Sequence, residues 1–367
     1  MASSTLRIEG AKEFYTYETA HFDLETNVTA ELKSLVDESV SKATVQFKSE
    51  SAQAGIFTYE IAYTPTIRGR HELTVKVNGV DVSGSPFKVF VRHPPTQLGK
   101  PFKVLNGLDN AVGVTVGQNK TVYVARDTSY TVSVFDKRPV WIRSIGKYGT
   151  DPFGGNGPYG IATDDDGYIY VTTNSGHLLK VDMDGKDIQS VVVEKGNSLR
   201  GVKMHKGHLF VCDVKNHKVH KFDTKLNSVS SFYVMDITGE GYNRPMDLSF
   251  DAQGKIYICY YRNVQVVDAN GQYLNLFSKK GDGGAENGDG VEKITDPRGI
   301  HVFGDHVYIS EYSNHSISVF STDGDFITSF GKRGEERGEL EKPHGITVDV
   351  DGFVYVCDNG NQRVQVF

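Results

Sequence analysis

Cysteine, tryptophan and long apolar runs are scarce in this sequence of 367 residues. Three cysteines cannot form a disulfide framework and leave an odd thiol, which indicates a reducing compartment, so we expect a cytoplasmic protein. No apolar run approaches the roughly 18 residues of a membrane-spanning helix, and the N-terminus lacks the form of a signal peptide. A formal charge of -6 excludes a strongly basic chain. These absences argue against a secreted disulfide scaffold, a membrane partner and a basic nucleic-acid-binding tail.

Glycine and aromatic residues are, by contrast, abundant. The chain has 39 Gly, 20 Phe and 19 Tyr, against 11 Pro and a single Trp. Many glycines together with many β-favouring aromatics predict short strands joined by tight turns. Asp-Gly pairs such as Asp166-Gly167 and Asp323-Gly324 fit such turns, because tight hairpins require positive φ. We therefore expect an all-β protein.

A repeated unit begins near residue 110. Its six openings are Val112-Gly113-Val114, Pro158-Tyr159-Gly160-Ile161, Leu199-Arg200-Gly201-Val202, Pro245-Met246-Asp247-Leu248, Pro297-Arg298-Gly299-Ile300 and Pro343-His344-Gly345-Ile346. Successive openings lie 41 to 52 residues apart, and each leads to a second strand about ten residues later, as at Val122-Tyr123-Val124. A period in the forties is typical of a four-stranded blade. Six units therefore predict a six-bladed β-propeller.

The two ends of the repeat region are each incomplete. The sixth unit stops at Phe367 after its third strand, while Phe102-Lys103-Val104-Leu105 precedes the first unit as an orphan fourth strand. We expect a propeller over residues 101–367 whose closing blade is shared between residues 101–107 and 342–367. Such closure leaves no long open sheet edge.

Residues 6–92 do not share this period. Alternating strands such as Gly55–Ile61 and His71–Val77 predict a β-sandwich over residues 6–92. The stretch His93-Pro94-Pro95-Thr96 predicts a stiff linker over residues 93–100, because consecutive prolines restrict the backbone.

Both regions resemble known repeat families. The motifs of the last two repeats are Phe330-Gly331-Lys332-Arg333-Gly334, Gly338-Glu339-Leu340, Pro343-His344-Gly345-Ile346-Thr347-Val348-Asp349, Val354-Tyr355-Val356-Cys357-Asp358 and Asn361-Gln362-Arg363-Val364-Gln365-Val366-Phe367. They resemble the NHL repeat of six-bladed propellers. Repeats two and four depart from it at Asn174-Ser175-Gly176-His177 and Tyr261-Arg262-Asn263. The N-terminal stretches Gly55-Ile56-Phe57-Thr58-Tyr59, Tyr63-Thr64-Pro65-Thr66 and Gly84-Ser85-Pro86-Phe87-Lys88-Val89 resemble the filamin-type immunoglobulin repeat.

A filamin-type repeat followed by an NHL propeller is the C-terminal layout of a subgroup of tripartite-motif (TRIM) proteins. The resemblance implies a non-catalytic target-recognition module. Any E3 ubiquitin-ligase activity is expected to reside in an upstream RING, since three cysteines could not build the zinc sites of a RING and B-box.

The candidate binding residues lie in loops that the propeller would bring to one rim of its channel, because loops on a rigid scaffold commonly carry function. They occupy positions next to the opening glycines or at the corners between second and third strands: Arg126, Tyr159, Arg200, Lys215, Arg244, Arg262, Arg298, His315, His344 and Arg363. The seven Arg and Lys residues among them outnumber five rim carboxylates, which are Asp127, Asp213, Asp247, Glu311 and Asp358. The opposite rim carries the acidic Asp-Gly turns. The negative net charge therefore averages an acidic rim with a mildly basic one.

Arginine interleaved with tyrosine and histidine suits RNA, because guanidinium groups meet phosphates and flat rings meet unstacked bases. Several TRIM-NHL relatives bind RNA in this way, whereas others bind proteins. The first hypothesis is therefore a hairpin loop or short single strand of RNA, bound for post-transcriptional regulation. The alternative is a protein or peptide, bound by the substrate-recognition platform of a RING-type E3 ubiquitin ligase. We expect no DNA partner.

The same residues also have a purely structural explanation, in which arginines at strand corners pair with neighbouring carboxylates, for example Arg363 with Asp358. If Arg200, Arg244 and Arg298 were each held by a carboxylate, the protein ligand would be favoured.

Catalysis is less favoured. Six-bladed propellers that are lactonases or lyases hold a metal with several carboxylate, Asn or His ligands. The positions before the glycines offer one histidine, His344, and no carboxylate, with Asp247 and His301 nearby. We therefore expect no catalytic residue, no metal and no cofactor. Cys212, Cys259 and Cys357 share one small-residue position of the repeat with Ala125, Thr172 and Ser310, which predicts a packing role for these thiols.

Overall fold

The computed structural model describes residues 8–9, 28–34, 40–42, 44–50, 57–62, 69–81, 85–91, 95–277 and 294–367, apart from residues 118, 137, 139, 147–152, 154–156, 187, 194–197, 236–242 and 261. Two compact units meet in the sequence at residues 94 and 95, and each is described by itself. Within the described residues, no helix is both long and apolar enough to cross a membrane. The predicted all-β fold class, a sandwich followed by a propeller, is confirmed.

The first unit contains two sheets. One has the strand order β1-β5-β4 and the other β3-β2-β6-β7, with β8 also paired to β6. Their bounds are β1 (Ile8–Glu9), β2 (Val28–Ser34), β3 (Val40–Lys42), β4 (Thr44–Glu50), β5 (Phe57–Ala62), β6 (Gly69–Val77), β7 (Val80–Asp81) and β8 (Phe87–Val91). Side chains alternate along β6, where Leu73 and Val75 are buried and Thr74 and Lys76 are partly exposed. This two-residue period gives the sandwich its inner face.

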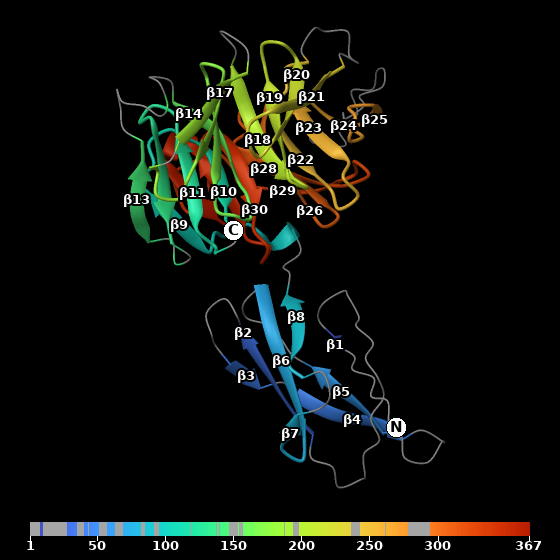
Figure 1. Cartoon of the computed structure of the whole chain (residues 1–367). Coiled ribbons are helices and arrows are strands. Elements are labelled where there is room, and N and C mark those ends of the chain that lie inside the picture. Colours follow the sequence, from blue (N-terminus) through green and yellow to red (C-terminus); the bar gives the residue numbers. More distant parts are fainter. Residues whose placement is uncertain are drawn as a thin grey trace. The chain divides into compact units, whose positions relative to one another are not determined.

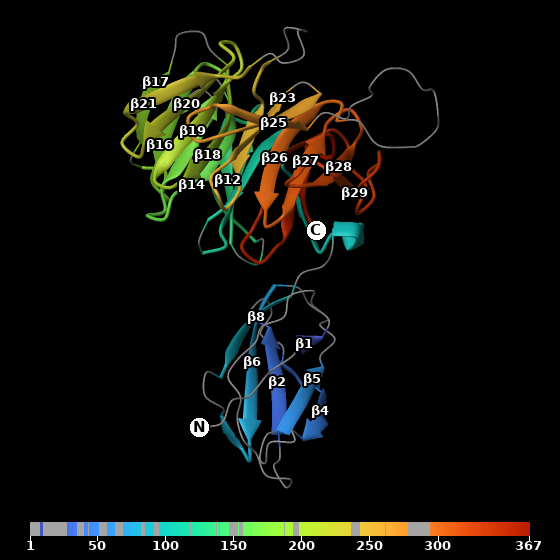
Figure 2. The same cartoon turned by 90° about the vertical axis from the view of Figure 1, so that its right-hand side faces the viewer.

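The second unit consists of six four-stranded antiparallel sheets, which form a ring of blades (Figures 1 and 2). The innermost strands are β10 (Ala111–Val116), β14 (Pro158–Thr163), β18 (Leu199–His205), β22 (Asp247–Phe250), β26 (Pro297–Phe303) and β30 (Pro343–Val348). The second strands are β11 (Val122–Arg126), β15 (Ile169–Thr173), β19 (His208–Asp213), β23 (Ile256–Tyr260), β27 (His306–Glu311) and β31 (Val354–Asp358).

The third strands are β12 (Thr131–Phe135), β16 (His177–Val181), β20 (Lys218–Asp223), β24 (Asn263–Val267), β28 (Ser316–Ser321) and β32 (Arg363–Val366). The outer strands are β13 (Trp141–Ile145), β17 (Ile188–Val192), β21 (Ser228–Tyr233), β25 (Tyr273–Phe277), β29 (Phe326–Phe330) and, in the last blade, β9 (Lys103–Asn106). Two short 3-10 helices, η1 (Pro95–Gln97) and η2 (Asn359–Asn361), complete the described elements. Because β9 pairs with β32 in the order β30-β31-β32-β9, strands from both ends of the unit form one blade.

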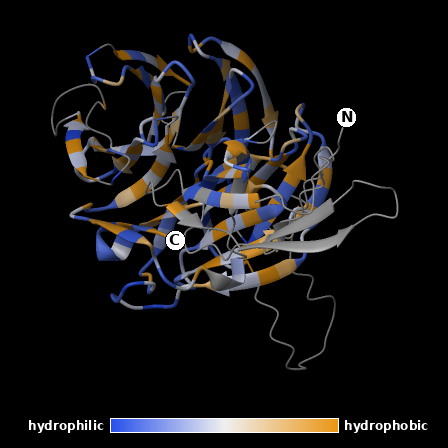
Figure 3. Cartoon of the chain, turned by 90° about the horizontal axis from the view of Figure 1, so that it is seen from below, coloured by the Kyte–Doolittle hydropathy of each residue, from blue (hydrophilic) through white to orange (hydrophobic). Residues whose placement is uncertain are grey.

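The core of the propeller lies between adjacent blades. Five apolar clusters of buried residues each join strands of two successive blades, and hydrophobic bands follow the strands in Figure 3. The second strands β15, β23 and β31 are buried along their whole length, whereas the outer strand β21 is largely exposed. Side chains on both faces of these second strands are therefore buried. This explains why the second strands have continuous apolar runs in the sequence.

The opening glycines allow neighbouring innermost strands to approach closely around the channel. A Cβ at Gly345 would lie 2.6 Å from the Val112 carbonyl oxygen, and a Cβ at Gly299 would lie 2.7 Å from the His344 carbonyl oxygen. The backbone leaves no room for either methyl group. The fourth blade has Asp247 in this position, and its Oδ2 accepts a hydrogen bond from the Ile300 N–H at 3.1 Å.

Candidate functional site

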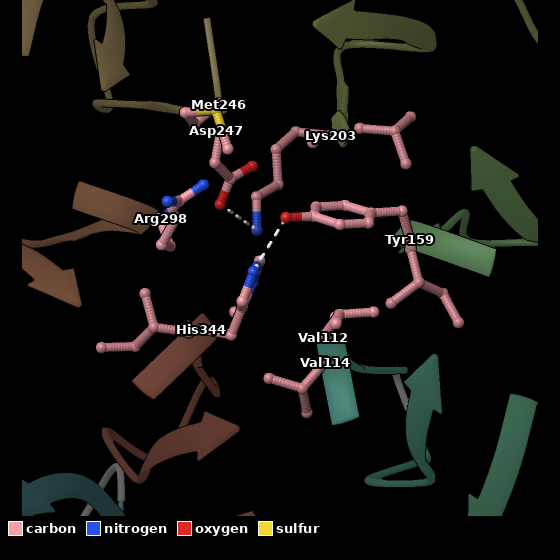
Figure 4. Close-up of a pocket in the computed structure, with 15 residues that line it drawn as sticks. Val112, Val114, Tyr159, Lys203, Met246, Asp247, Arg298 and His344 are labelled. Carbon is pink, nitrogen blue, oxygen red and sulfur yellow. Dashed lines mark hydrogen bonds and ion pairs between the residues drawn. The ribbon is translucent and has the colours of Figure 1, made fainter. Parts of the chain in front are cut away.

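The mouth of the channel is where the residues before the opening glycines meet. Five of the six innermost strands have a register shift at their start; β22, which has Asp247 in place of glycine, pairs without one. Such bulges redirect the side chains beside them. Figure 4 shows Tyr159, Lys203, Asp247, Arg298 and His344 directed toward one another around a cavity of about 20 Å³. A cavity of this size holds about one water molecule.

Tyr159 and His344 connect across the channel mouth, from β14 and β30. The Tyr159 hydroxyl lies 2.8 Å from His344 Nε2, and the two rings meet edge to face with their centroids 5.1 Å apart. Both residues are buried, and the blade between theirs contributes only the small Val112 at the corresponding position. Burial, with help from the charges of Arg298 and Arg200, lowers the pKa of His344 to about 3. His344 is therefore neutral at pH 7, and its Nε2 shares a hydrogen bond with the Tyr159 hydroxyl.

Arg200 stacks on the Tyr159 ring of this Tyr159–His344 pair. Its guanidinium carbon is 3.9 Å from the centroid of the Tyr159 ring, and its NH1 donates to Asn174 Oδ1. Its Nε is buried without a hydrogen-bond partner among the described residues. Stacking on a tyrosine fixes the orientation of the guanidinium and leaves its charge uncancelled by a directly bonded carboxylate.

Arg298 occupies the other side of the mouth. Its guanidinium carbon lies 4.8 Å from the centroid of Tyr312, and its Nε lies 3.1 Å from Asp296 Oδ1. The Tyr312 ring in turn meets His344 edge to face at 6.1 Å. A continuous series of rings and guanidinium groups therefore crosses the channel mouth from Arg200 to Arg298. Of Arg200, Arg244 and Arg298, Arg298 is the one paired with a described carboxylate.

Lys203 and Asp247 line the same cavity, and Lys203 is not among the expected site residues. Lys203 Nζ is 3.9 Å from Asp247 Oδ2 (Figure 4). Burial raises the pKa of Asp247 and lowers that of His301 to about 3, and the Lys203 charge adds to the second shift. Lys203 stands two positions after the opening glycine Gly201. Side chains at this position of an innermost strand point into the channel, so the spacing could have identified Lys203 as a site residue.

Three of the expected residues, Arg126, His315 and Arg363, are held by contacts with neighbouring protein groups. Arg126 forms an ion pair with Asp109 and donates to Ser133 Oγ at 3.3 Å. His315 Nδ1 accepts a hydrogen bond from the Lys342 N–H at 3.0 Å.

Arg363 is the most firmly held of these residues. It donates to Asp358 Oδ2 at 2.6 Å and to the carbonyl oxygens of Glu335, Glu336 and Glu339 at 2.7 to 2.9 Å. Only 9% of the residue is exposed. Its role is therefore structural, as the Asp358 pairing anticipated.

Three other expected residues are exposed at the same rim. Lys215 follows β19, Arg244 precedes β22, and Arg262 begins the corner into β24 with a φ of 62°. These exposed cations belong to the corners of the third and fourth blades.

Four of the five rim carboxylates counted from the sequence are buried. Asp213, Glu311 and Asp358 have no measurable exposure, and Asp247 is 7% exposed. Backbone N–H groups of the corners donate to them, as Thr295 and Asp296 do to Glu311 Oε2 at 3.0 and 3.2 Å. Among the twelve residues of the seven-to-five count, Lys215, Arg244 and Arg262 are exposed and none of the five carboxylates is.

The cysteine position has a structural role. In the blades that carry a hydroxyl there, Thr172 Oγ1 and Ser310 Oγ accept hydrogen bonds from the N–H groups of Gly160 and Gly299 at 2.9 and 2.8 Å. Cys212, Cys259 and Cys357 are free and buried, and burial raises the pKa of each thiol. Across the part of the chain that the structure describes, no three His, Cys, Asp or Glu side chains are placed to hold a metal ion.

Comparisons with known proteins support both units. The description "Filamin/ABP280 repeat" matches residues 3–88, and the description "NHL repeat" matches residues 340–367. Residues 150–181 match "Strictosidine synthase-like, N-terminal".

The similar curated relatives match over short segments. E3 ubiquitin-protein ligase TRIM71 of Mus musculus is 49% identical over 39 residues, which are 11% of this chain and 5% of that protein. Protein lin-41 of Caenorhabditis elegans is 54% identical over 41 residues, which are 11% of this chain and 4% of that protein. The matched segments thus span about a twentieth of these relatives' own length.

Solved structures are similar in fold. A streptogramin B lyase aligns with a TM-score of 0.51 at 14% identity, over 81% of this chain and 89% of that chain. A hydrazine synthase of Kuenenia stuttgartiensis aligns with a TM-score of 0.51 at 15% identity, over 72% of this chain and 96% of that chain. At such identities the likeness shows the fold alone.

Proposed function

Because the two matched repeats and the TRIM71 and lin-41 relatives support this chain as the filamin-plus-NHL region of a TRIM-NHL protein, we propose that its target-recognition surface binds RNA. The site is the channel mouth with its surrounding rim, and the ligand is a hairpin loop or a short single strand. The module itself is non-catalytic and acts in the cytoplasm in post-transcriptional regulation.

The observation that carries the proposal is the series of rings and guanidinium groups across the mouth. Arg200, stacked on Tyr159 and hydrogen-bonded to Asn174, presents an oriented charge with a buried Nε donor. The exposed Lys215, Arg244 and Arg262 supply further positive charge at the rim. RNA recognition depends on such oriented phosphate contacts. Neutral His344 and Tyr159 act by positioning Arg200.

A protein or peptide ligand, recognised for ubiquitination by a RING-type ligase, is the second candidate. The observation that favours it is the pairing of Arg298 with Asp296 at 3.1 Å, since a cation already held by a carboxylate contributes less to phosphate binding. Arg200 and Arg244 lack such a carboxylate partner among the described residues, which is why RNA is placed first.

The test is enrichment of a random RNA pool on the purified chain at low and moderate salt. We expect enrichment that weakens with salt and that is lost in the Arg200→Glu plus Arg298→Glu variant. A matched control replaces two exposed lysines at turns of the opposite rim, Lys186→Glu plus Lys225→Glu, and is expected to keep the enrichment. Absence of enrichment at low salt, or enrichment unchanged by the Arg200 and Arg298 substitutions, would contradict the RNA proposal.

A further inference from the structure

A second groove lies beside β9 in the closing blade, away from the channel mouth. Its volume is about 520 Å³, and its lining includes Lys103, Arg138, Arg337 and Arg363 but no carboxylate. The groove is therefore lined by four basic residues and no acidic one.

Two of these cations carry charge that the protein does not cancel. Arg337 is exposed, and its NH2 donates to the carbonyl oxygens of Pro101 and Phe102 at 3.1 and 3.4 Å. Lys103 Nζ lies 5.1 Å from the centroid of the Phe102 ring. Neither residue forms an ion pair with a carboxylate within the described ranges.

The other two cations are compensated. Arg138 pairs with Asp136 at 2.9 Å, although 75% of its side chain remains exposed, and Arg363 is bound to the buried Asp358. The attraction for an anionic ligand therefore comes chiefly from Lys103 and Arg337, with Arg138 at the groove's margin.

The strand that lines the groove is also the edge of its sheet. β9 pairs with β32 through Lys103–Asn106, and no other described strand pairs with it. An edge strand can accept an extended peptide as an added strand, in which every second side chain, about 6.8 Å apart, points to the same side. Acidic residues at alternate positions of such a peptide would reach the groove's cations together.

The groove contains a single aromatic ring. Phe102 packs against Phe353 with a centroid distance of 5.2 Å and is 48% exposed. Single-stranded nucleic acid stacks successive bases on several ring faces, and one ring does not provide such a series. An acidic peptide needs only the cations and the backbone of β9.

We propose that this groove binds an extended acidic segment of a partner protein, which adds to β9 as an edge strand and places its carboxylates against Lys103 and Arg337. This surface is separate from the rim site and would allow a protein and an RNA to bind the same propeller at once.

The probe is a fluorescein-labelled decapeptide of alternating Glu and Val, titrated with the full chain by fluorescence anisotropy. We expect saturable binding that is weakened about tenfold or more by the Lys103→Glu plus Arg337→Glu variant. The Lys103→Glu variant, which keeps the hydrogen bonds of Arg337, is expected to weaken binding about tenfold or more as well. The Lys186→Glu plus Lys225→Glu control, which changes the net charge equally, is expected to bind normally. A second peptide of the same sequence with every backbone nitrogen methylated, which cannot donate backbone hydrogen bonds, is expected to bind at least tenfold more weakly.

Each other outcome would overturn the proposal. Equal binding by the Lys103 and Arg337 variants would place the peptide elsewhere. Equal binding of the N-methylated peptide would exclude strand addition. No binding of the Glu-Val peptide, together with binding of a twelve-nucleotide uridine RNA that the Lys103 and Arg337 substitutions abolish, would assign the groove to RNA instead. Thermal unfolding of each variant establishes that it is folded.

Discussion

His344 makes the propeller's stability depend on pH in a direction that the structure fixes. Its pKa in the folded chain is about 3, mainly because the ring is buried and secondarily because Arg298 and Arg200 are near. In the unfolded chain an ordinary histidine has a pKa of about 6.5. Between these values the unfolded chain binds a proton that the folded chain does not, so the free energy of unfolding decreases as the pH falls.

The size of this change in the free energy of unfolding follows from the pH interval between the two pKa values of His344. From pH 7 to pH 5 the unfolded histidine becomes almost fully protonated while the folded one stays neutral, which costs about 2 kcal/mol of stability. Replacing His344 with Gln removes the titrating group and retains an acceptor for the Tyr159 hydroxyl. The stability difference between wild type and His344→Gln is therefore expected to shift by about 2 kcal/mol in favour of the variant over this range.

The assay is urea unfolding at pH 7, 6 and 5, followed by the fluorescence of Trp141. It is the single tryptophan and lies in the propeller, so the signal reports that unit. Other titrating groups, including His301 with a similarly lowered pKa, are present in both proteins and cancel in the comparison. If wild type and His344→Gln show the same pH dependence, His344 is not a buried neutral residue and the described channel mouth is incorrect.

Two further predictions concern single side chains of the rim. Tyr159→Phe removes the hydroxyl that bonds His344 and is expected to lower the free energy of unfolding by about 1 kcal/mol, as measured by urea unfolding at pH 7; an unchanged midpoint would show that the hydrogen bond does not form. Arg363→Gln leaves the buried Asp358 without its ion pair and is expected to lower the free energy of unfolding by about 3 kcal/mol. Arg244→Gln at the exposed rim is expected to lower it by less than about 0.5 kcal/mol. Thermal unfolding measures both changes. Equal losses in these two variants would contradict the distinction drawn between a structural and an exposed arginine.

The fold could be predicted from the sequence because the repeat encodes it locally. An opening glycine recurs where innermost strands approach one another, and small residues recur behind it, so spacing alone indicated the blades. Asp247 interrupts the glycine series without breaking the fold, because its carboxylate accepts a hydrogen bond from the next blade.

The site could be predicted only in part. The positions before the opening glycines follow from the repeat, and Val112, Tyr159, Met246, Arg298 and His344 at these positions line the cavity of the channel mouth. The contact between Tyr159 and His344 joins blades that are not adjacent and depends on the small Val112 between them, which no local pattern reveals. Burial of the rim carboxylates is likewise a property of the folded corners, so the sequence count does not show that the exposed members are the cations.

The salt dependence of RNA affinity tests the central claim most directly. With an RNA selected on the wild-type chain, the logarithm of the association constant is plotted against the logarithm of salt concentration for wild type, Arg200→Gln plus Arg298→Gln, and Lys186→Gln plus Lys225→Gln. If Arg200 and Arg298 each contact one phosphate, the slope of the first variant is shallower than that of wild type by about 1.4, and its affinity at low salt is at least about tenfold weaker. The control is expected to keep the wild-type slope. Identical slopes and affinities for all three proteins would contradict RNA binding at the channel mouth.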